Sequence, residues 1–211
     1  MKKTALIWGA SGGIGRALVK TLENDGWMVA ATARNADAIE ELGEWQFEAD
    51  VSDEFSVQAA VQEIAQQAGE VNWWIYAAGD IHSSPVETTR SEDWQRVLQT
   101  NLSGVYLTAK HSLPLLADKA PLYILGAVSE RMRLPGLGAY AAAKAGVEAL
   151  AEVLKKELRR PVVVVRPGAV KTALWDKVPF KMPPNALSPE ELSKKILSAY
   201  QQGFKELKMD V

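Results

Sequence analysis

The sequence predicts a single-domain α/β fold, a doubly wound parallel sheet with helices on both faces. Two patterns along the 211 residues predict it. Short apolar segments of strand length alternate with longer segments of helical periodicity. The apolar segments are also hydrophobic at almost every position, as strands must be when helices cover both faces of a parallel sheet. We find no linker, repeat or low-complexity segment, so one domain over residues 1–211 is expected.

The first two strands and the helix between them form a βαβ unit. Residues 4–9 (TALIWG) and 27–34 (WMVAATAR) are the expected strands, and a glycine-rich turn, GASGGIG at residues 9–15, opens the helix. Glycines let the backbone approach a pyrophosphate, and the helix end presents free N–H groups and a positive dipole end. The unit therefore predicts a nucleotide-binding Rossmann fold. The alternative is a tight turn that binds no ligand.

The remaining elements continue the alternation. Further strands are expected at residues 45–50, 71–79, 121–127 and 161–168, with a last edge strand within 205–211. Helices are expected at residues 53–67, 91–114, 139–160 and 188–202. Ser91 is the expected N-cap of the second, and Ser188-Pro-Glu-Glu191 is a capping box that opens the last.

Ligands of an open parallel sheet bind beyond the carboxyl ends of its strands. We therefore expect one crevice at this edge, with Tyr140 reaching into it from the following helix. The strand ends that should surround it are Gly9, Arg34, Asp50, Gly79, Ala127 and Gly168.

Tyr140 and Lys144 stand four residues apart, one turn of a helix on the same face. An ammonium beside a phenol favours the phenolate and should lower the tyrosine pKa from its usual value of ~10. Such a tyrosine can exchange a proton with a carbonyl oxygen at neutral pH. The alternative is an ordinary surface pair on an amphipathic helix.

Composition excludes several other classes of protein. The net charge of −2 and the pI of 5.8 give no basic surface for nucleic acid. The chain has no cysteine, and His82 and His111 are too far apart in sequence to suggest a metal site. No apolar run reaches the ~18 residues of a membrane span, and the start does not predict a signal peptide. A reducing, cytoplasmic location is expected.

Several motifs in order resemble those of the short-chain dehydrogenase/reductase family, over nearly the whole chain. They are Gly9-x-x-x-Gly13-x-Gly15, Asp50-Val51, Ala78-Gly79, Asn101, Tyr140-x-x-x-Lys144 and Pro167-Gly-Ala-Val-Lys-Thr172. The resemblance implies a cofactor site made of Gly9, Ser11, Gly13, Ile14, Gly15, Asp50, Val51, Ala78, Gly79, Tyr140, Lys144, Pro167, Gly168, Val170 and Thr172.

The resemblance also implies catalytic roles. Tyr140 would be the general acid/base, Lys144 would tune its pKa and contact the ribose, and Asn101 would hold a proton-relay water. Hydride would pass between the nicotinamide and the carbon of a carbonyl or alcohol substrate.

Three departures from the family pattern matter. Trp8 precedes Gly9, and Tyr76-Ala77 replace two asparagines, which should affect scaffolding more than chemistry. The family's catalytic serine falls on Ala127, and the nearest hydroxyl belongs to Ser129. Residues two apart in an extended segment face the same side, so Ser129 is a candidate substrate-oxygen donor. The alternative is that Ser129 is only a loop residue.

The second strand indicates which nucleotide binds. A site for NAD(H) places an acid near its end to bind the ribose 2′-hydroxyl, but no acid follows before Asp37. Arg34 is placed to pair with a 2′-phosphate. NADP(H) is therefore expected rather than NAD(H), the alternative being an arginine in a solvated loop.

The segment after Thr172 and the longer helices bear on substrate and assembly. A short lid at residues 173–187 carries Leu174, Trp175, Val178, Phe180 and Met182, which indicate an apolar substrate or only a lid packed on the core. One rival function is a non-catalytic NADP(H)-binding sensor or partner-binding module, and another is epimerisation or dehydration on the same scaffold. A homodimer or homotetramer is expected, since many relatives pair through the helices that carry Asn101 and Tyr140. The longer of the two offers Trp94, Leu98, Leu102 and Tyr106.

Overall fold

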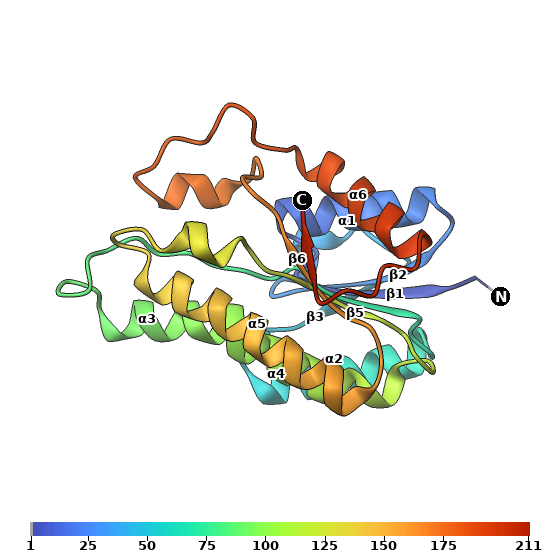
Figure 1. Ribbon diagram of the computed structural model, residues 1–211. Coiled ribbons are helices and arrows are strands. Elements are labelled where there is room, and N and C mark those ends of the chain that lie inside the picture. Colours follow the sequence, from blue (N-terminus) through green and yellow to red (C-terminus); the bar gives the residue numbers. More distant parts are fainter. Residues whose placement is uncertain (1) are drawn as a thin grey trace.

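The computed structural model describes residues 2–211, apart from the side chains of Ser129 and Arg131. Its centre is one seven-stranded sheet in the order β3-β2-β1-β4-β5-β6-β7, and every pair of neighbouring strands is parallel. Helices α1 and α6 cover one face of the sheet, and α2, α3, α4 and α5 cover the other (Figure 1). This arrangement confirms the predicted doubly wound α/β fold.

All the predicted strands are present, and most are shorter than the apolar runs that predicted them. They are β1 (Thr4–Trp8), β2 (Met28–Ala33), β3 (Trp45–Glu48), β4 (Trp73–Tyr76), β5 (Leu122–Leu125), β6 (Val162–Arg166) and β7 (Lys208–Asp210). The four central strands β1, β4, β5 and β6 are buried at every position, whereas the edge strands β3 and β7 are partly exposed. The residues beyond the carboxyl ends leave the sheet ladder and become the walls of the site.

The helices are α1 (Gly13–Asn24), α2 (Glu54–Gln67), α3 (Ser91–Leu98), α4 (Gly104–Ser112), α5 (Gly138–Leu158) and α6 (Pro189–Gln201). The capping box at α6 is confirmed, because the Ser188 hydroxyl accepts from the Glu191 N–H and the Glu191 carboxylate accepts from the Ser188 N–H. The prediction of Ser91 as an N-cap is wrong. The Arg90 carbonyl already accepts from the Trp94 N–H, so Arg90 is the cap and Ser91 is helical.

The long helix expected from Ser91 to about Pro114 is interrupted. A π-helical segment, η2 (Gln99–Ser103), joins α3 to α4, and a short turn, η3 (Leu113–Leu115), ends the run. Single π turns inside α-helices are frequent at functional sites. Here the π turn contains Asn101, one of the expected site residues.

Each face of the sheet has its own apolar core. On the α1 and α6 side, the Trp73 ring stacks on Tyr200 with centroids 4.1 Å apart, and Trp27 and Tyr123 meet Trp73 at tilted or edge angles. On the other side, Trp74 and Tyr76 pack among aliphatic residues of the sheet and of α2, α4 and α5. Burying aromatic side chains of this size supplies much of the stability of a domain.

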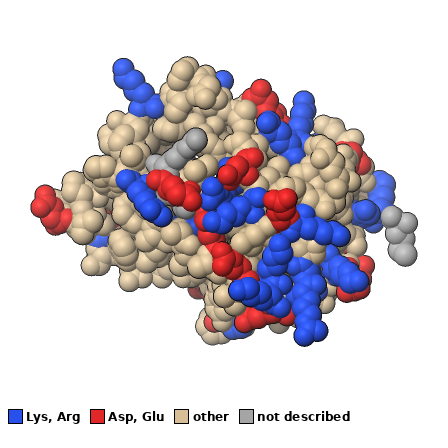
Figure 2. All heavy atoms as spheres, in the orientation of Figure 1, with Lys and Arg blue, Asp and Glu red and all other residues tan. Residues whose placement is uncertain are grey.

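Charges are mixed over the face seen in Figure 2, where Lys and Arg gather over the C-terminal end of α5. Lys155 and Lys156 lie in the last turn of that helix, where cations complement the helix dipole. No helix among residues 2–211 is both long enough and apolar enough to cross a membrane. Tyr106 of α4 is 47% exposed, and the homo-oligomer expected from this helix stays a prediction.

Candidate active site

The glycine-rich turn has the close backbone approach that the sequence predicts. Gly9 has a φ of +88°, and a Cβ at this residue would collide with the backbone of Ala78. A Cβ at Gly15 would collide with the Gly9 carbonyl, so Gly15 lets α1 pack tightly against the turn. Both positions therefore require glycine, Gly9 for conformation and contact and Gly15 for contact alone.

The first turn of α1 presents backbone donors to a cavity. Gly12 is the N-cap of the helix and provides no side-chain hydrogen bond to the first turn. Ser11, Gly12, Gly13 and Ile14 all line the cavity beside it. Free N–H groups at the start of a twelve-residue helix suit a phosphate group, so this end of the cavity fits a nucleotide pyrophosphate.

Two cavities meet at the carboxyl ends of the strands. The first, which we call the glycine-loop cavity, has a volume of about 330 Å³. Its walls include Gly9, Ser11, Gly13, Ile14, Arg34, Asp50, Val51, Ala78, Gly79, Asn101, Tyr140, Lys144 and Thr172. These thirteen residues were all expected at the site, and four of the predicted strand ends are among them. Gly15 lies where α1 packs against the glycine-rich turn, and it lines neither cavity.

The second cavity, the apolar cavity, has a volume of about 390 Å³ and is lined mainly by hydrophobic side chains. Ala127, Pro167, Gly168 and Val170 lie here rather than in the glycine-loop cavity. Its other walls include Ile81, Met132, Leu134, Leu137, Leu174, Trp175, Val178 and Phe180. Five residues line both cavities: Ile14, Gly126, Tyr140, Thr172 and Leu174.

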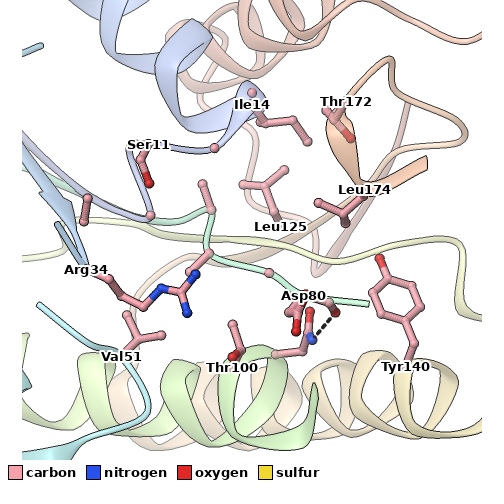
Figure 3. Close-up of a pocket in the computed structure, with 18 of the residues that line it drawn as sticks. Ser11, Ile14, Arg34, Val51, Asp80, Thr100, Leu125, Tyr140, Thr172 and Leu174 are labelled. Carbon is pink, nitrogen blue, oxygen red and sulfur yellow. Dashed lines mark hydrogen bonds between the residues drawn. The ribbon is translucent and has the colours of Figure 1, made fainter. Parts of the chain in front are cut away.

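Tyr140 lies where the two cavities meet. It comes from the first turn of α5, and its phenol points into the cavity on the side of Leu174 (Figure 3). Lys144 lies one turn further along the helix. Its Nζ is 5.5 Å from the centroid of the Tyr140 ring and donates a hydrogen bond of 2.9 Å to the Leu125 carbonyl. Both residues are buried, with 8% and 4% of their surfaces exposed.

The expected lowering of the Tyr140 pKa is wrong for this arrangement. Burial raises the pKa of Tyr140 to about 12, and burial lowers the pKa of Lys144 to about 8. Desolvation by burial disfavours the charged form of each group, and it sets the direction of both pKa shifts. Tyr140 therefore keeps its proton at neutral pH.

The Lys144 pKa gives a prediction for stability. Between pH 8 and 10.5 the unfolded chain binds a proton at this lysine that the folded chain has lost, so stability should rise with pH. The rise is on the order of 3 kcal/mol, since the two pKa values differ by about 2.5 units and each unit corresponds to ~1.4 kcal/mol. The Lys144→Met variant should lack it. Urea unfolding from pH 7.5 to 10 measures the difference between the two proteins, and a difference independent of pH would contradict the burial argument.

Asn101 is held firmly and leaves one acceptor unused. Its Nδ2 donates to the Asp80 carbonyl at 2.6 Å, the bond drawn as a dashed line in Figure 3. It also donates to the Val97 carbonyl at 2.8 Å. Its Oδ1 is buried, has no hydrogen-bond partner among the described residues, and faces Gly79. A buried acceptor without a partner suits an ordered water.

Tyr76 occupies the place of a family asparagine and supports this segment. Its hydroxyl donates a 2.5 Å hydrogen bond to the Thr100 carbonyl, inside the π turn that carries Asn101. Tyr76 is fully buried, and burial raises the pKa of its phenol well above the usual range. The side chain is thus part of the scaffold, in agreement with the sequence interpretation.

Arg34 lies at the opposite end of the glycine-loop cavity from Tyr140. Its guanidinium extends into the cavity above Val51 (Figure 3). Asp37 does not line the cavity; its N–H instead donates to the Asn35 side chain in the turn η1 (Ala36–Ile39). The cavity wall at the end of β2 therefore carries a cation and not an acid.

Ala127 and Ser129 are the two positions that bear on the expected hydroxyl donor. Ala127 lines the apolar cavity near Tyr140 and is 7% exposed. Ser129 begins the turn η4 (Ser129–Met132), and its side chain lies outside the described part of the structure. Its expected role as a substrate-oxygen donor stays a prediction.

Three charged residues of the glycine-loop cavity were missed from the sequence. Asp80 follows Gly79, Arg96 belongs to α3, and Lys177 ends the turn η5 (Ala173–Lys177). An acid directly after a strand end was a signal for Asp80. Nothing in the sequence pairs it with Arg96 or Lys177, which approach it only in the folded chain.

Comparison with known proteins identifies the family. Residues 3–182 match the short chain dehydrogenase family, and the chain belongs to this family of oxidoreductases. It is 32% identical over 182 residues to 3-oxoacyl-[acyl-carrier-protein] reductase of Mus musculus, covering 82% of this chain and 77% of that protein. It is 30% identical over 181 residues to the Escherichia coli reductase of the same name, FabG, covering 81% of this chain and 74% of the relative.

The solved structures show the same fold. An alcohol dehydrogenase from Thermococcus sibiricus, complexed with 5-hydroxy-NADP, matches with a TM-score of 0.91 and 24% identity over 100% of this chain and 96% of its own. BdcA in complex with NADPH matches with a TM-score of 0.84 and 22% identity over 99% and 92% of the two chains. Family membership and the glycine-rich turn together support the use of a nicotinamide nucleotide.

Proposed function

We propose that the protein is an NADP(H)-dependent oxidoreductase that transfers hydride between the nicotinamide and a carbonyl or alcohol substrate, with Tyr140 as the acid/base. The observation that carries the proposal is that Tyr140 lines both cavities. A phenol at this place meets a nucleotide on one side and an apolar substrate on the other. A proton donor must lie within hydrogen-bond reach of the reacting oxygen, and Tyr140 would be that donor for a substrate at the junction of the two cavities.

The walls of the glycine-loop cavity fit the nucleotide. The free N–H groups at the start of α1 would hold the pyrophosphate, Asp50 and Val51 the adenine, and Arg34 the 2′-phosphate. Lys144 would contact the ribose next to the nicotinamide. When bound, the nicotinamide supplies or accepts the hydride, and the protein orients it.

The side chains around the reacting oxygen handle the proton. Tyr140 keeps its proton at neutral pH, because burial holds its pKa near 12, and it can therefore donate to a carbonyl oxygen. The free Oδ1 of Asn101 would hold a water that returns a proton to the site. This protonation state favours reduction of a carbonyl, and the curated relatives named above are reductases.

The apolar cavity favours an apolar substrate. Leu174, Val178 and Phe180 of the lid pack against the cluster that contains Tyr140, and they also line the cavity. Lid packing and an apolar binding surface are thus properties of the same side chains. Ketones, aldehydes or quinones with a hydrocarbon body fit such walls better than sugars do.

A second candidate is a non-catalytic NADP(H)-binding module on the same fold. Ala127 favours it, because it stands where the family has its catalytic serine. The buried Tyr140 and Lys144 favour the enzyme, since binding alone does not need a buried phenol beside an ammonium. Oxidation of NADPH by the purified protein with a panel of ketones, aldehydes and quinones separates the two functions. Tight NADPH binding without turnover across the panel would favour the module.

Arg34→Ala tests the choice of nucleotide. The variant should bind NADPH about 10- to 150-fold more weakly, the loss of ~1.5–3 kcal/mol expected for a hydrogen bond to a charged group. NADH lacks the 2′-phosphate, so its affinity should hardly change and serves as the internal control. Fluorescence titration of both nucleotides measures the effect, and a parent protein that prefers NADH would refute the assignment.

A further inference from the structure

Asp80 joins three elements around the glycine-loop cavity. Its carboxylate accepts from Lys177 Nζ at 2.6 Å, and it forms an ion pair with the Arg96 guanidinium. The Asp80 side chain is only 13% exposed, whereas those of Arg96 and Lys177 are 45% and 54% exposed. A carboxylate buried to this degree needs partners of opposite charge. Two cations from different segments, α3 and η5, therefore converge on the segment that follows β4.

Lys177 belongs to the lid, and Asp80 lies in the segment after β4 that lines the glycine-loop cavity. This ion pair therefore connects the lid to the wall of that cavity. The apolar lid residues Leu174, Val178 and Phe180 pack on the other side, against the cluster with Tyr140. Apolar contacts of this kind are not directional. A charge-assisted hydrogen bond to a buried carboxylate fixes one geometry. The lid is thus held in two ways, by the packing of its apolar side chains and by the ion pair of Lys177.

The same aspartate also contacts the proposed catalytic group. The Asp80 backbone carbonyl accepts one of the two hydrogen bonds that fix the Asn101 amide. Asp80 therefore lies between the lid and Asn101, with its side chain turned to Lys177 and its main chain to the π turn. Substitution of the carboxylate alone leaves the carbonyl in place, which allows the two contacts to be tested separately.

We propose that the Asp80–Lys177 ion pair anchors the lid over the junction of the two cavities, and that Lys177 is the positioning residue that controls nucleotide release. The part on nucleotide release rests on the proposed function, whereas the anchor itself does not. Release requires the lid to move, and lid opening limits the turnover of many enzymes. The ion pair has to break before η5 can move away from Asp80. Removing it should therefore speed both lid opening and nucleotide release.

The test compares Lys177→Met with Lys181→Met, which removes another lid lysine whose side chain lines the apolar cavity. Hydrogen exchange of the Trp175 and Val178 amides, which both donate within the turn, reports lid opening without nucleotide. Lys177→Met should speed this exchange roughly 5- to 10-fold, the scale of one partly exposed ion pair with a buried partner. NADPH dissociation, followed by stopped flow, should accelerate by a similar factor. In Lys181→Met, the rates of lid exchange and of NADPH dissociation should both stay within about twofold of those of the parent.

Asp80→Asn provides the second variant and keeps the Asn101 contact. It should speed lid exchange as Lys177→Met does, while the amides of the π turn keep the protection of the parent. Unchanged lid exchange in Lys177→Met would overturn the proposal. So would weaker NADPH binding with unchanged lid exchange, because Lys177 would then be a direct ligand of the nucleotide. If no nicotinamide nucleotide binds at all, the proposed function fails, and the exchange measurements still decide whether the anchor exists.

Discussion

Tyr140→Phe is expected to lower turnover by roughly 10²–10⁴-fold, the usual contribution of general acid–base catalysis. The variant keeps the buried ring and removes the proton that would pass to the substrate oxygen. Nucleotide affinity should stay nearly intact, because the glycine-rich turn and Arg34 are untouched. Steady-state turnover with the best substrate of the panel, together with NADPH titration, measures both quantities.

Tyr123→Phe is the matched control. Tyr123 lies on β5, its buried hydroxyl has no hydrogen-bond partner in the described part of the structure, and it lines neither cavity. Removing that hydroxyl should leave turnover unchanged. Lys144→Ala should reduce both turnover and nucleotide affinity, since the same ammonium lies beside the phenol and would touch the ribose. A Tyr140→Phe enzyme that turns over like the parent would remove Tyr140 from the mechanism.

The position of the site was predictable because it follows from the topology. Parallel strands end at one edge of the sheet, so Gly9, Arg34, Asp50 and Gly79 had to approach one another once the alternation of strands and helices was recognised. Gly15 is different. The family motif implied a cofactor contact for it, whereas in the structure it lets α1 pack against the turn and lines neither of the two cavities.

Quantities that depend on burial and on long-range contacts could not be predicted. The spacing of Tyr140 and Lys144 indicates that they are neighbours, but it does not show that both are desolvated, and desolvation decides the direction of both pKa shifts. The π turn at Asn101 depends in part on the Tyr76 hydrogen bond to Thr100, 24 residues away. The Asp80–Lys177 pair joins residues 97 positions apart, beyond the reach of any local pattern.

Ser129→Ala tests the departure at Ala127. We propose that Ser129 donates to the substrate oxygen in place of the missing family serine. Its removal should then raise the barrier by ~2–4 kcal/mol, the cost of losing one oxyanion donor. This corresponds to a roughly 30- to 1000-fold lower turnover. Since the group acts on the reacting oxygen, the loss should appear in turnover and leave NADPH affinity unchanged.

Ala127→Ser, made on the Ser129→Ala background, completes the test. Ala127 lines the apolar cavity with Tyr140, so a hydroxyl at this residue should recover at least tenfold of the lost turnover. Rescue would show that the reaction needs one donor near Tyr140 and that two neighbouring positions can supply it. If Ser129→Ala instead turns over like the parent while Tyr140→Phe does not, the enzyme works without this hydroxyl, and Tyr140 alone donates to the substrate oxygen.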